Sequence, residues 1–322
     1  MLPHEIDSIA ARHVPGTGKP DVHALRMGLI NDTYRVVRDG RAYALRVAAS
    51  NPCDLGLDRA WEARVVEGAA HGGFAPALEF CDPRLGILVA RWADGRSWSS
   101  GDARLPSNLA RMAALIRGIH ALPMPESPRV MSPSTWIDYY TEAIGKSAGP
   151  LRAAAPAQGS AAILRFEARA RLAALAALPS ADPVLCHSDL HTLNLIDSGR
   201  TLVLLDWEYA HASDPLWDLA GWSANNDFEE ELRRELLAAY TGRRPTPDEY
   251  SRLQLLGWLF DYIALLWSEL YLMRRSTVQG LSVQGEVSAR AEILAARLIA
   301  SKVVEPGKFR HTTPPSDETH AG

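Results

Sequence analysis

The pattern of this chain changes near residue 95. Before that point, short alternating segments separated by turn residues predict strands, and Asp39-Gly40 is a strong hairpin signal. Asn31-Asp32 is predicted to be a turn, and the spacing over 58–70 predicts a helix that begins after Asp58. The predicted strands cover residues 21–30, 33–38, 41–48, 77–81 and 86–92. The first part is therefore predicted to be a small antiparallel sheet with one helix.

After Gly95 the apolar residues recur with helical spacing. The predicted helices cover residues 108–122, 134–144, 161–178, 229–240, 247–274 and 286–303. Two short apolar runs, 184–186 and 202–205, with the turn 197–200 between them, predict a hairpin-like insertion. The fold class is thus α+β, with an N-terminal lobe over 1–94 and a larger, mainly helical lobe over 95–304. Residues 148–160 are predicted to be a loop, and the polar residues 305–322 a disordered tail.

Composition and charge exclude several classes of function. The net charge of −4 argues against a general binder of nucleic acid, which would carry a basic excess. The sequence contains no run of about 18 apolar residues, so we predict no membrane span. It shows no basic segment followed by an apolar one, so we predict no secretory signal. The three cysteines, Cys53, Cys81 and Cys186, are far apart and indicate reduced thiols. We therefore expect a cytoplasmic protein without a membrane or nucleic-acid partner; the sequence does not indicate its oligomeric state.

The stretch from 184 to 219 carries the chemistry. Asp189 and Asn194 follow the first apolar run, and Asp206 directly follows the second. Phosphoryl transfer needs a carboxylate that accepts the proton of the attacking hydroxyl, and an amide oxygen and a second carboxylate that hold Mg²⁺. Asp189 suits the first role, and Asn194 and Asp206 the second. An Asp and an Asn five residues apart can equally be capping groups in a loop, and His187 is interpreted as a structural residue that braces the loop.

The motifs in this stretch resemble a known superfamily. His187-x-Asp189-x-His191-x-x-Asn194 is similar to the catalytic loop of the aminoglycoside phosphotransferase and choline kinase superfamily, which has a protein-kinase-like fold. The segments 206–210 and 214–220 resemble the choline/ethanolamine kinase branch, which includes bacterial choline kinases and thiamine kinase. The resemblance covers about residues 20 to 300 and implies a two-lobe fold that uses ATP and Mg²⁺. It also implies that Asp218 braces the catalytic loop.

The same resemblance implies nucleotide-binding roles in the first lobe. Residues 28–34, with Asn31, resemble the nucleotide loop, although G-x-G-x-x-G is absent and an ordinary turn is the alternative. Arg46 stands where protein kinases carry the strand lysine that holds phosphates, and Arg can bind phosphate in a bidentate way. Glu62 is its expected partner, the alternative being a solvated helix residue. The stretch 89–93 resembles the hinge that pairs with adenine, with Val89, Arg91 and Trp92 as its predicted binding residues.

The phosphate acceptor is predicted from aromatic and acidic residues in the second lobe. Aromatic rings beside carboxylates suit a cationic ligand, and the resemblance implies acceptor-binding roles for Glu208, Tyr262 and Trp267. A packed aromatic core is the alternative interpretation. The predicted function is therefore an ATP-dependent kinase that acts on a small cationic metabolite, such as choline or an ethanolamine-like amino alcohol. The alternatives are a thiamine kinase, an aminoglycoside-type phosphotransferase, and a pseudokinase that binds nucleotide without transferring phosphate.

Overall fold

A five-stranded antiparallel sheet forms most of the N-terminal part of the computed structural model, which describes residues 3–27, 30–48, 55–147, 160–275 and 281–301. Its strands run in the order β1-β2-β3-β5-β4, with the bounds β1 Asp21–Met27, β2 Asn31–Arg38, β3 Arg41–Ala48, β4 Leu78–Asp82 and β5 Ile87–Arg91. The predicted hairpin turn is confirmed, because Asp39 and Gly40 both have positive φ angles, 49° and 74°. The predicted turn at Asn31-Asp32 is wrong: both residues pair with β3 at the start of β2.

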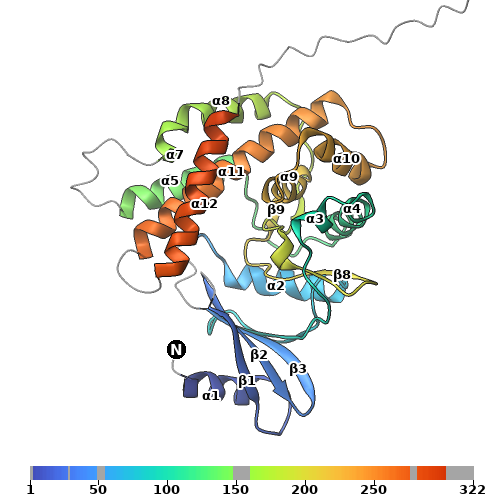
Figure 1. Cartoon of the computed structure of the whole chain (residues 1–322), viewed down its shortest axis with the longest axis vertical. Coiled ribbons are helices and arrows are strands. Elements are labelled where there is room, and N and C mark those ends of the chain that lie inside the picture. Colours follow the sequence, from blue (N-terminus) through green and yellow to red (C-terminus); the bar gives the residue numbers. More distant parts are fainter. Residues whose placement is uncertain (1–2, 28–29, 49–54, 148–159, 276–280, 302–322) are drawn as a thin grey trace, which may run out of the picture.

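A helix that the sequence analysis did not predict packs on this sheet. Helix α1 (Pro3–His13) contributes Ile6 and Ala10 to a core that it shares with Val36, Leu45 and Val89 of the strands. Apolar residues of β2 and β3 alternate between buried and half-buried positions, as a sheet with one covered face requires. We call α1 and the five-stranded sheet the sheet lobe (Figure 1).

The helix predicted over 58–70 is confirmed as α2 (Arg59–His71), and the Asp58 side chain caps it by accepting a hydrogen bond from the Trp61 amide. Helix α2 lies between the sheet and the remaining helices (Figure 1). Its buried residues Trp61 and Val65 belong to the core of those helices rather than to the core of the sheet lobe. The Trp61 Nε1 atom donates a 2.7 Å hydrogen bond to the carbonyl of Ala210. The helix is therefore fixed to the C-terminal part.

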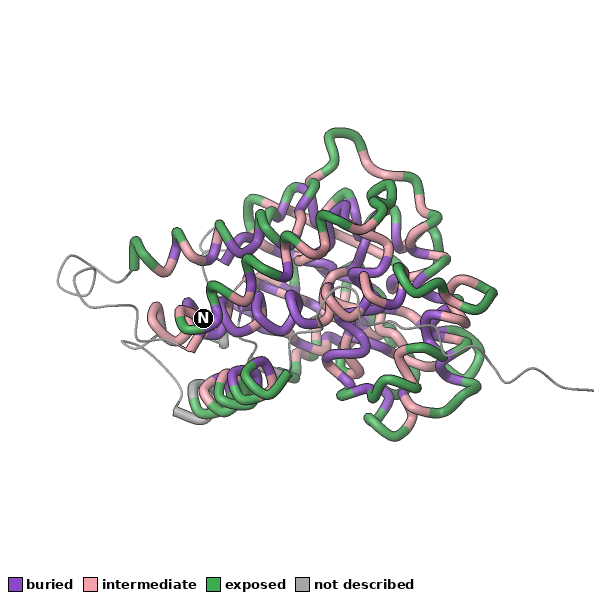
Figure 2. The backbone as a smooth tube through the Cα atoms, turned by 90° about the horizontal axis from the view of Figure 1, so that it is seen from above, coloured by how far each residue is buried: buried purple, intermediate pink, exposed green. Residues whose placement is uncertain are grey.

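The C-terminal part is mainly helical, so the predicted α+β fold class is confirmed (Figure 1). We call it the helical lobe. The predicted helix over 161–178 is divided at Leu164 into α7 and α8. The buried residues lie on the sides of the helices that face the interior of the lobe (Figure 2). The helices are α3 Ser100–Ala103, α4 Pro106–His120, α5 Pro133–Ser147, α7 Ser160–Ile163, α8 Arg165–Ala176, α9 Leu216–Asn225, α10 Glu230–Thr241, α11 Pro247–Arg275 and α12 Leu281–Ala300, with a 3-10 turn over Thr192–Asn194.

Helix α11 has the length and the apolar composition of a membrane span. Within its most apolar 18-residue window, however, 61% of the residues are buried inside the fold. The helix packs against α5, α9 and α12. Its composition is thus explained by a central position in the helical lobe.

Four short strands in the helical lobe carry the loops that were predicted to be functional. These strands are β6 Val184–Cys186, β7 Leu195–Asp197, β8 Leu202–Leu204 and β9 His211–Ser213. The two apolar runs do not pair with each other as the predicted insertion implied. Strand β6 pairs with β9, and β8 pairs with β7 through the turn at 198–201. Two small antiparallel ladders therefore hold the predicted site from both sides.

The lobes are connected by residues 92–99, and the predicted boundary between 94 and 95 stays a prediction. Gly95 has a φ of 148°, and a Cβ atom there would lie 2.5 Å from the carbonyl oxygen of Asp197. Only glycine allows this close approach of the connection to β7. Of the other predictions, those for Gly28, Cys53, most of the 148–160 loop and the 305–322 tail lie outside the described residues. Cys81 and Cys186 are free thiols.

Candidate active site

The loop after β6 is held by a buried carboxylate. Asp218, at the start of α9, accepts hydrogen bonds from the backbone amides of His187 (2.9 Å) and Ser188 (2.7 Å). His120 Nε2 lies 3.2 Å from the same carboxylate, and the His120 ring also contacts the Tyr240 hydroxyl. Ser188 has a φ of 69°, a conformation that costs energy for a side chain of this type. The brace at Asp218 therefore stabilises a strained loop.

His187 lies beneath the loop with no solvent exposure. Its Nε2 atom donates a 3.0 Å hydrogen bond to the carbonyl of Leu205, so Nδ1 is the acceptor that faces the amide of Asp189. Burial lowers the pKa of His187, against the charges of Asp218 and Asp189. This geometry is that of a neutral bracing residue, the role predicted for His187.

Asp189 and Asn194 lie together at the edge of the helical lobe. The Asn194 Nδ2 atom donates hydrogen bonds to the backbone carbonyl of Asp189 (3.0 Å) and to its Oδ2 atom (3.1 Å). Burial raises the pKa of Asp189, but His191, with Nε2 3.6 Å from the carboxylate, outweighs it, so that the pKa lies below its usual value. Asp189 is therefore ionised at neutral pH and able to accept a proton.

Asp206 follows β8 with a left-handed backbone, φ 61°, a region that Asp and Asn occupy more readily than other side chains. The amide of Leu205 donates a 2.8 Å hydrogen bond to the carbonyl of Asn194 and so fixes the spacing of the two predicted metal ligands. The carboxylate oxygens of Asp206, Glu62 and Glu208 lie within 4.8 Å of one another. Oxygen ligands of this kind suit Mg²⁺, and the Asp206 side chain is the most exposed of the three at 35%.

A network of charged side chains crosses from the sheet lobe to the helical lobe. Arg46 on β3 donates to Glu62 on α2, as predicted, and to Asp206 Oδ1 at 2.9 Å. Arg59 on α2 donates to Glu62 at 2.8 Å and to Glu208 at 2.9 Å. Two cations thus face three carboxylates. Burial and the nearby charge of Asp206 raise the pKa of Glu208 to about 8.

Asn31 and Glu208 meet within this network. The Asn31 Nδ2 atom donates to Glu208 at 2.6 Å, and Arg59 donates to Asn31 Oδ1 at 2.7 Å. Glu208 is therefore bound by groups of the first 94 residues, and its acceptor-binding role stays a prediction. Arg59 was missed, although its position three residues before Glu62 on one helix face was a usable signal.

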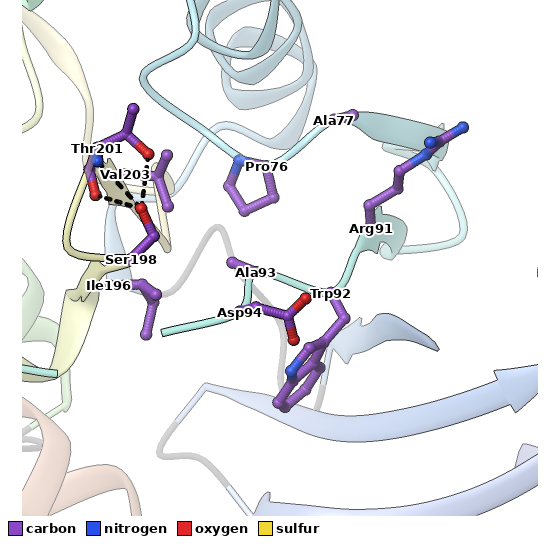
Figure 3. A pocket seen from close by; sticks show the side chains of 10 residues that line it. All are labelled: Pro76, Ala77, Arg91, Trp92, Ala93, Asp94, Ile196, Ser198, Thr201 and Val203. Atoms are coloured by element: carbon purple, nitrogen blue, oxygen red, sulfur yellow. Dashed lines mark hydrogen bonds between the residues drawn. The ribbon is translucent and has the colours of Figure 1, made fainter. Parts of the chain in front are cut away.

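The connection between the lobes borders a cavity of about 270 Å³ (Figure 3). Arg91 and Trp92 line it, together with Ile196 and Val203 from the β7–β8 hairpin. The Arg91 guanidinium is already paired with Glu79 at 2.5 Å. Val89 does not line the cavity but is fully buried in the core of the sheet lobe. Two of the three predicted hinge residues therefore lie at this cavity.

Aromatic side chains from α5, from α11 and from the segment after Asp206 meet in the helical lobe. Trp267 donates a 2.7 Å hydrogen bond to the Tyr209 hydroxyl and stacks on Tyr271 at 5.3 Å. The ring centre of Trp136 on α5 lies 6.2 Å from that of Tyr209, and Trp136 stacks on Tyr140 with 5.4 Å between their ring centres. We call these five residues the aromatic cluster. Burial, with smaller contributions that include the charge of Asp189, raises the pKa values of Tyr140 and Tyr209.

Tyr262 lies elsewhere. It is 1% exposed, stacks on Trp258 at 5.5 Å, and donates a 3.0 Å hydrogen bond to the carbonyl of Ala161. The structure therefore does not bring Tyr262 to Trp267, although both are on α11. Tyr209 and the α5 residues Trp136 and Tyr140 take the place that was predicted for Tyr262. The Trp-Glu-Tyr sequence at 207–209 was the signal for Tyr209.

Comparison with known proteins gives matches over most of the chain. The model of the phosphotransferase enzyme family matches residues 21–256. No curated protein matches in sequence. Among solved structures, a choline/ethanolamine kinase family protein from Mesorhizobium loti is similar, with 26% identity, a TM-score of 0.71, and coverage of 93% of this chain and 94% of the other.

Two further solved structures share the fold. The choline kinase LicA from Streptococcus pneumoniae is 20% identical, with a TM-score of 0.68 and coverage of 91% of this chain and 98% of the other. The macrolide 2'-phosphotransferase MphH from Brachybacterium faecium is 19% identical, with a TM-score of 0.61 and coverage of 93% and 98%. The two-lobe architecture is thus shared by proteins with different acceptors.

Proposed function

Since this chain belongs to the phosphotransferase enzyme family and is a phosphotransferase that acts on a small-molecule hydroxyl group, we propose that it transfers the γ-phosphoryl group of ATP to a small cationic alcohol. A choline-like or ethanolamine-like amino alcohol is the acceptor class that we favour. The observation that carries the proposal is that Tyr209, three residues after Asp206, meets the rings of Trp267 and Trp136, so that aromatic side chains directly follow the predicted metal ligand. The choline/ethanolamine kinase family protein with 26% identity supports the same acceptor class.

The proposed chemistry assigns one task to each group. Asp189 accepts the proton of the acceptor hydroxyl while that oxygen bonds to the γ-phosphorus and the bond to ADP breaks. Asn194 and Asp206 would hold Mg²⁺, which when bound neutralises charge on the phosphate oxygens. Arg46, oriented by Glu62, would contact the phosphates in a bidentate way. The adenine would lie at the connection near Trp92.

The acceptor would be recognised by its cationic nitrogen. The faces of Trp and Tyr rings attract cations, by roughly 0.5–2 kcal/mol per ring. Tyr209 and Trp267 bring such rings to the segment that follows Asp206.

The proposal is tested with purified full-length protein and Mg·ATP against a panel of alcohols. The panel contains choline, ethanolamine, thiamine, an aminoglycoside and 3,3-dimethylbutanol, which is the uncharged analogue of choline. We expect ADP formation with a cationic amino alcohol and little with the uncharged analogue. Equal rates with choline and its uncharged analogue would contradict the cationic class, and turnover of the aminoglycoside alone would favour that alternative.

A further inference from the structure

A second cavity lies inside the helical lobe, away from the catalytic loop. Its volume is about 190 Å³, and α8, α9, α10, α11 and α12 surround it. None of the residues assigned above to catalysis, metal or nucleotide lines it. Helix α9 carries both Asp218, which braces the catalytic loop, and Ser223, which lines the cavity five residues later. Five residues turn a helix by about 140°, so the two side chains point in largely opposite directions.

The cavity contains buried hydrogen-bond donors that have no acceptor. Among the residues that the structure describes, Arg171 Nη2, Arg233 Nε and Ser223 Oγ have no hydrogen-bond partner. Arg171 is 6% exposed and Ser223 is 2% exposed. A buried donor without an acceptor costs roughly 1–3 kcal/mol. All three groups line the same cavity, so one ligand rich in acceptor oxygens would satisfy them together.

The charges that line the cavity are mainly positive. Three guanidinium groups, those of Arg171, Arg233 and Arg297, face one carboxylate, Asp261. Arg297 lies 3.2 Å from Asp261 and is also paired with Asp227, so this carboxylate already has a partner.

The other two arginines remain more available. The Nε atom of Arg171 lies 2.8 Å from Glu167, whereas its Nη2 atom has no partner. The Cζ atom of Arg171 lies 4.6 Å from the centre of the Trp258 ring. Burial lowers the pKa of Arg171, although the charge of Glu167 opposes this. For Arg233, no ion pair within 4.0 Å is found in the described part of the chain. The ionised forms of both side chains would therefore be stabilised by an anion.

We propose that this cavity binds one small tetrahedral oxyanion, either free phosphate or the phosphoryl group of a monoester. Guanidinium groups donate two parallel hydrogen bonds to phosphate oxygens, and Ser223 adds a hydroxyl donor. The cavity volume of about 190 Å³ is several times the roughly 30 Å³ that one water molecule occupies in the liquid. It therefore has room for one tetrahedral anion and a few water molecules.

The test is calorimetric titration of the full chain, without Mg²⁺ or nucleotide, with inorganic phosphate and separately with methyl phosphate. We expect saturable binding to one site. Arg233→Gln removes a charge-assisted hydrogen bond and should weaken binding roughly tenfold or more. Arg234→Gln is the matched control, because it makes the same charge change on α10 but does not line the cavity and is paired with Glu230. It should leave the affinity unchanged.

A second variant blocks the cavity without removing a donor. A Cβ atom at Gly257, which lines the cavity on α11, would meet no atom within 4 Å, so Gly257→Leu can fill the space. Gly145→Leu on α5 makes the same change at an exposed position that is also open. We expect binding to be lost in Gly257→Leu and kept in Gly145→Leu.

The outcomes separate this site from the catalytic cleft. Tighter binding of methyl phosphate than of inorganic phosphate assigns the site to a monoester, and the reverse order assigns it to the free anion. Absence of saturable binding to the wild type overturns the proposal. Binding that is lost in Arg46→Gln but kept in Arg233→Gln and Gly257→Leu overturns it as well, since the phosphate then occupies the nucleotide site.

Discussion

Asn31 donates a 2.6 Å hydrogen bond to Glu208 across 177 positions of the chain. One residue begins a strand of the sheet lobe, and the other follows the predicted metal ligand Asp206. Arg59 donates to both. The predicted nucleotide loop and the predicted metal-binding segment are therefore joined by side chains that are themselves buried.

The raised pKa of Glu208 predicts a pH-dependent stability. A folded-state pKa of about 8, above the usual value of 4.5, means that the folded protein binds the proton more tightly than the unfolded chain does. This contribution is fully present below pH 4.5 and is lost as the pH rises through 8. Glu208→Gln keeps a neutral hydrogen-bonding group at this position. We expect the free energy of unfolding of the wild type, relative to this variant, to fall by about 1–3 kcal/mol between pH 5 and 8.

The measurement is urea denaturation of both proteins at several pH values in this range. Taking the difference between the two unfolding free energies cancels the contributions of all titratable groups that the two proteins have in common. Parallel curves would show that Glu208 is already ionised in the folded protein at pH 5.

Asp189→Asn should abolish most of the phosphoryl transfer. The amide cannot accept the acceptor's proton, and loss of a general base typically costs about 10²–10⁴ in rate. Nucleotide affinity, measured by calorimetry, should be unchanged because Arg46 and the connection between the lobes are intact. A variant with wild-type kcat would rule out Asp189 as the base.

Asp206→Asn should remove most Mg²⁺-dependent activity while the fold is kept. Asn tolerates the left-handed backbone at this position and still offers an oxygen to Arg46. Its neutral amide is a much weaker ligand for a hard divalent cation than a carboxylate is. The check is the Mg²⁺ concentration that gives half-maximal rate. If neither this concentration nor kcat changes, Asp206 is not a ligand.

Trp267→Leu and Tyr262→Leu should separate the aromatic cluster from the helix core. Trp267 contacts Tyr209, so its replacement should raise the acceptor KM by about 2- to 30-fold and leave the KM for ATP unchanged. Tyr262 is buried against Ala161, so its replacement should mainly lower the melting temperature. The two substitutions remove a ring from the same helix, and each controls for the other. A larger rise in acceptor KM for Tyr262→Leu would reverse our assignment.

The fold was predictable where the pattern is local. The hairpin at Asp39-Gly40 and the cap at Asp58 depend on residues that are close in the sequence, and both are present. The pairing of β6 with β9 was not predictable, because three-residue strands carry no periodicity from which a partner can be inferred. Helix α1 was missed although Ile6, Ile9 and Ala10 recur at helical spacing, so the signal for it was present in the sequence.

The candidate site divides in the same way. Asp189, Asn194 and Asp206 lie on short segments next to the strands, and their sequence pattern was sufficient to predict that these segments meet, whereas their roles stay predictions. The contacts of Arg59 with Glu208 and of Tyr209 with Trp267 form only when segments more than 50 residues apart in the chain meet. Tyr262 has the right residue type on the right helix, but the rotation of α11 about its axis, which the sequence does not determine, directs it toward α7.

Helix α2 shares its core with the helical lobe, whereas Arg46 is on a strand of the sheet lobe. The Arg46–Glu62 ion pair therefore joins the sheet to a helix whose buried face belongs to the core of the helical lobe, although both residues belong to the first 94 of the chain. Any widening of the cleft that moves the sheet away from α2 must break the contacts of Arg46 with Glu62 and Asp206, and that of Asn31 with Glu208. The sheet and α2 are thus held together by charged contacts that are mostly buried, and added salt screens these much less than it screens ion pairs on the surface.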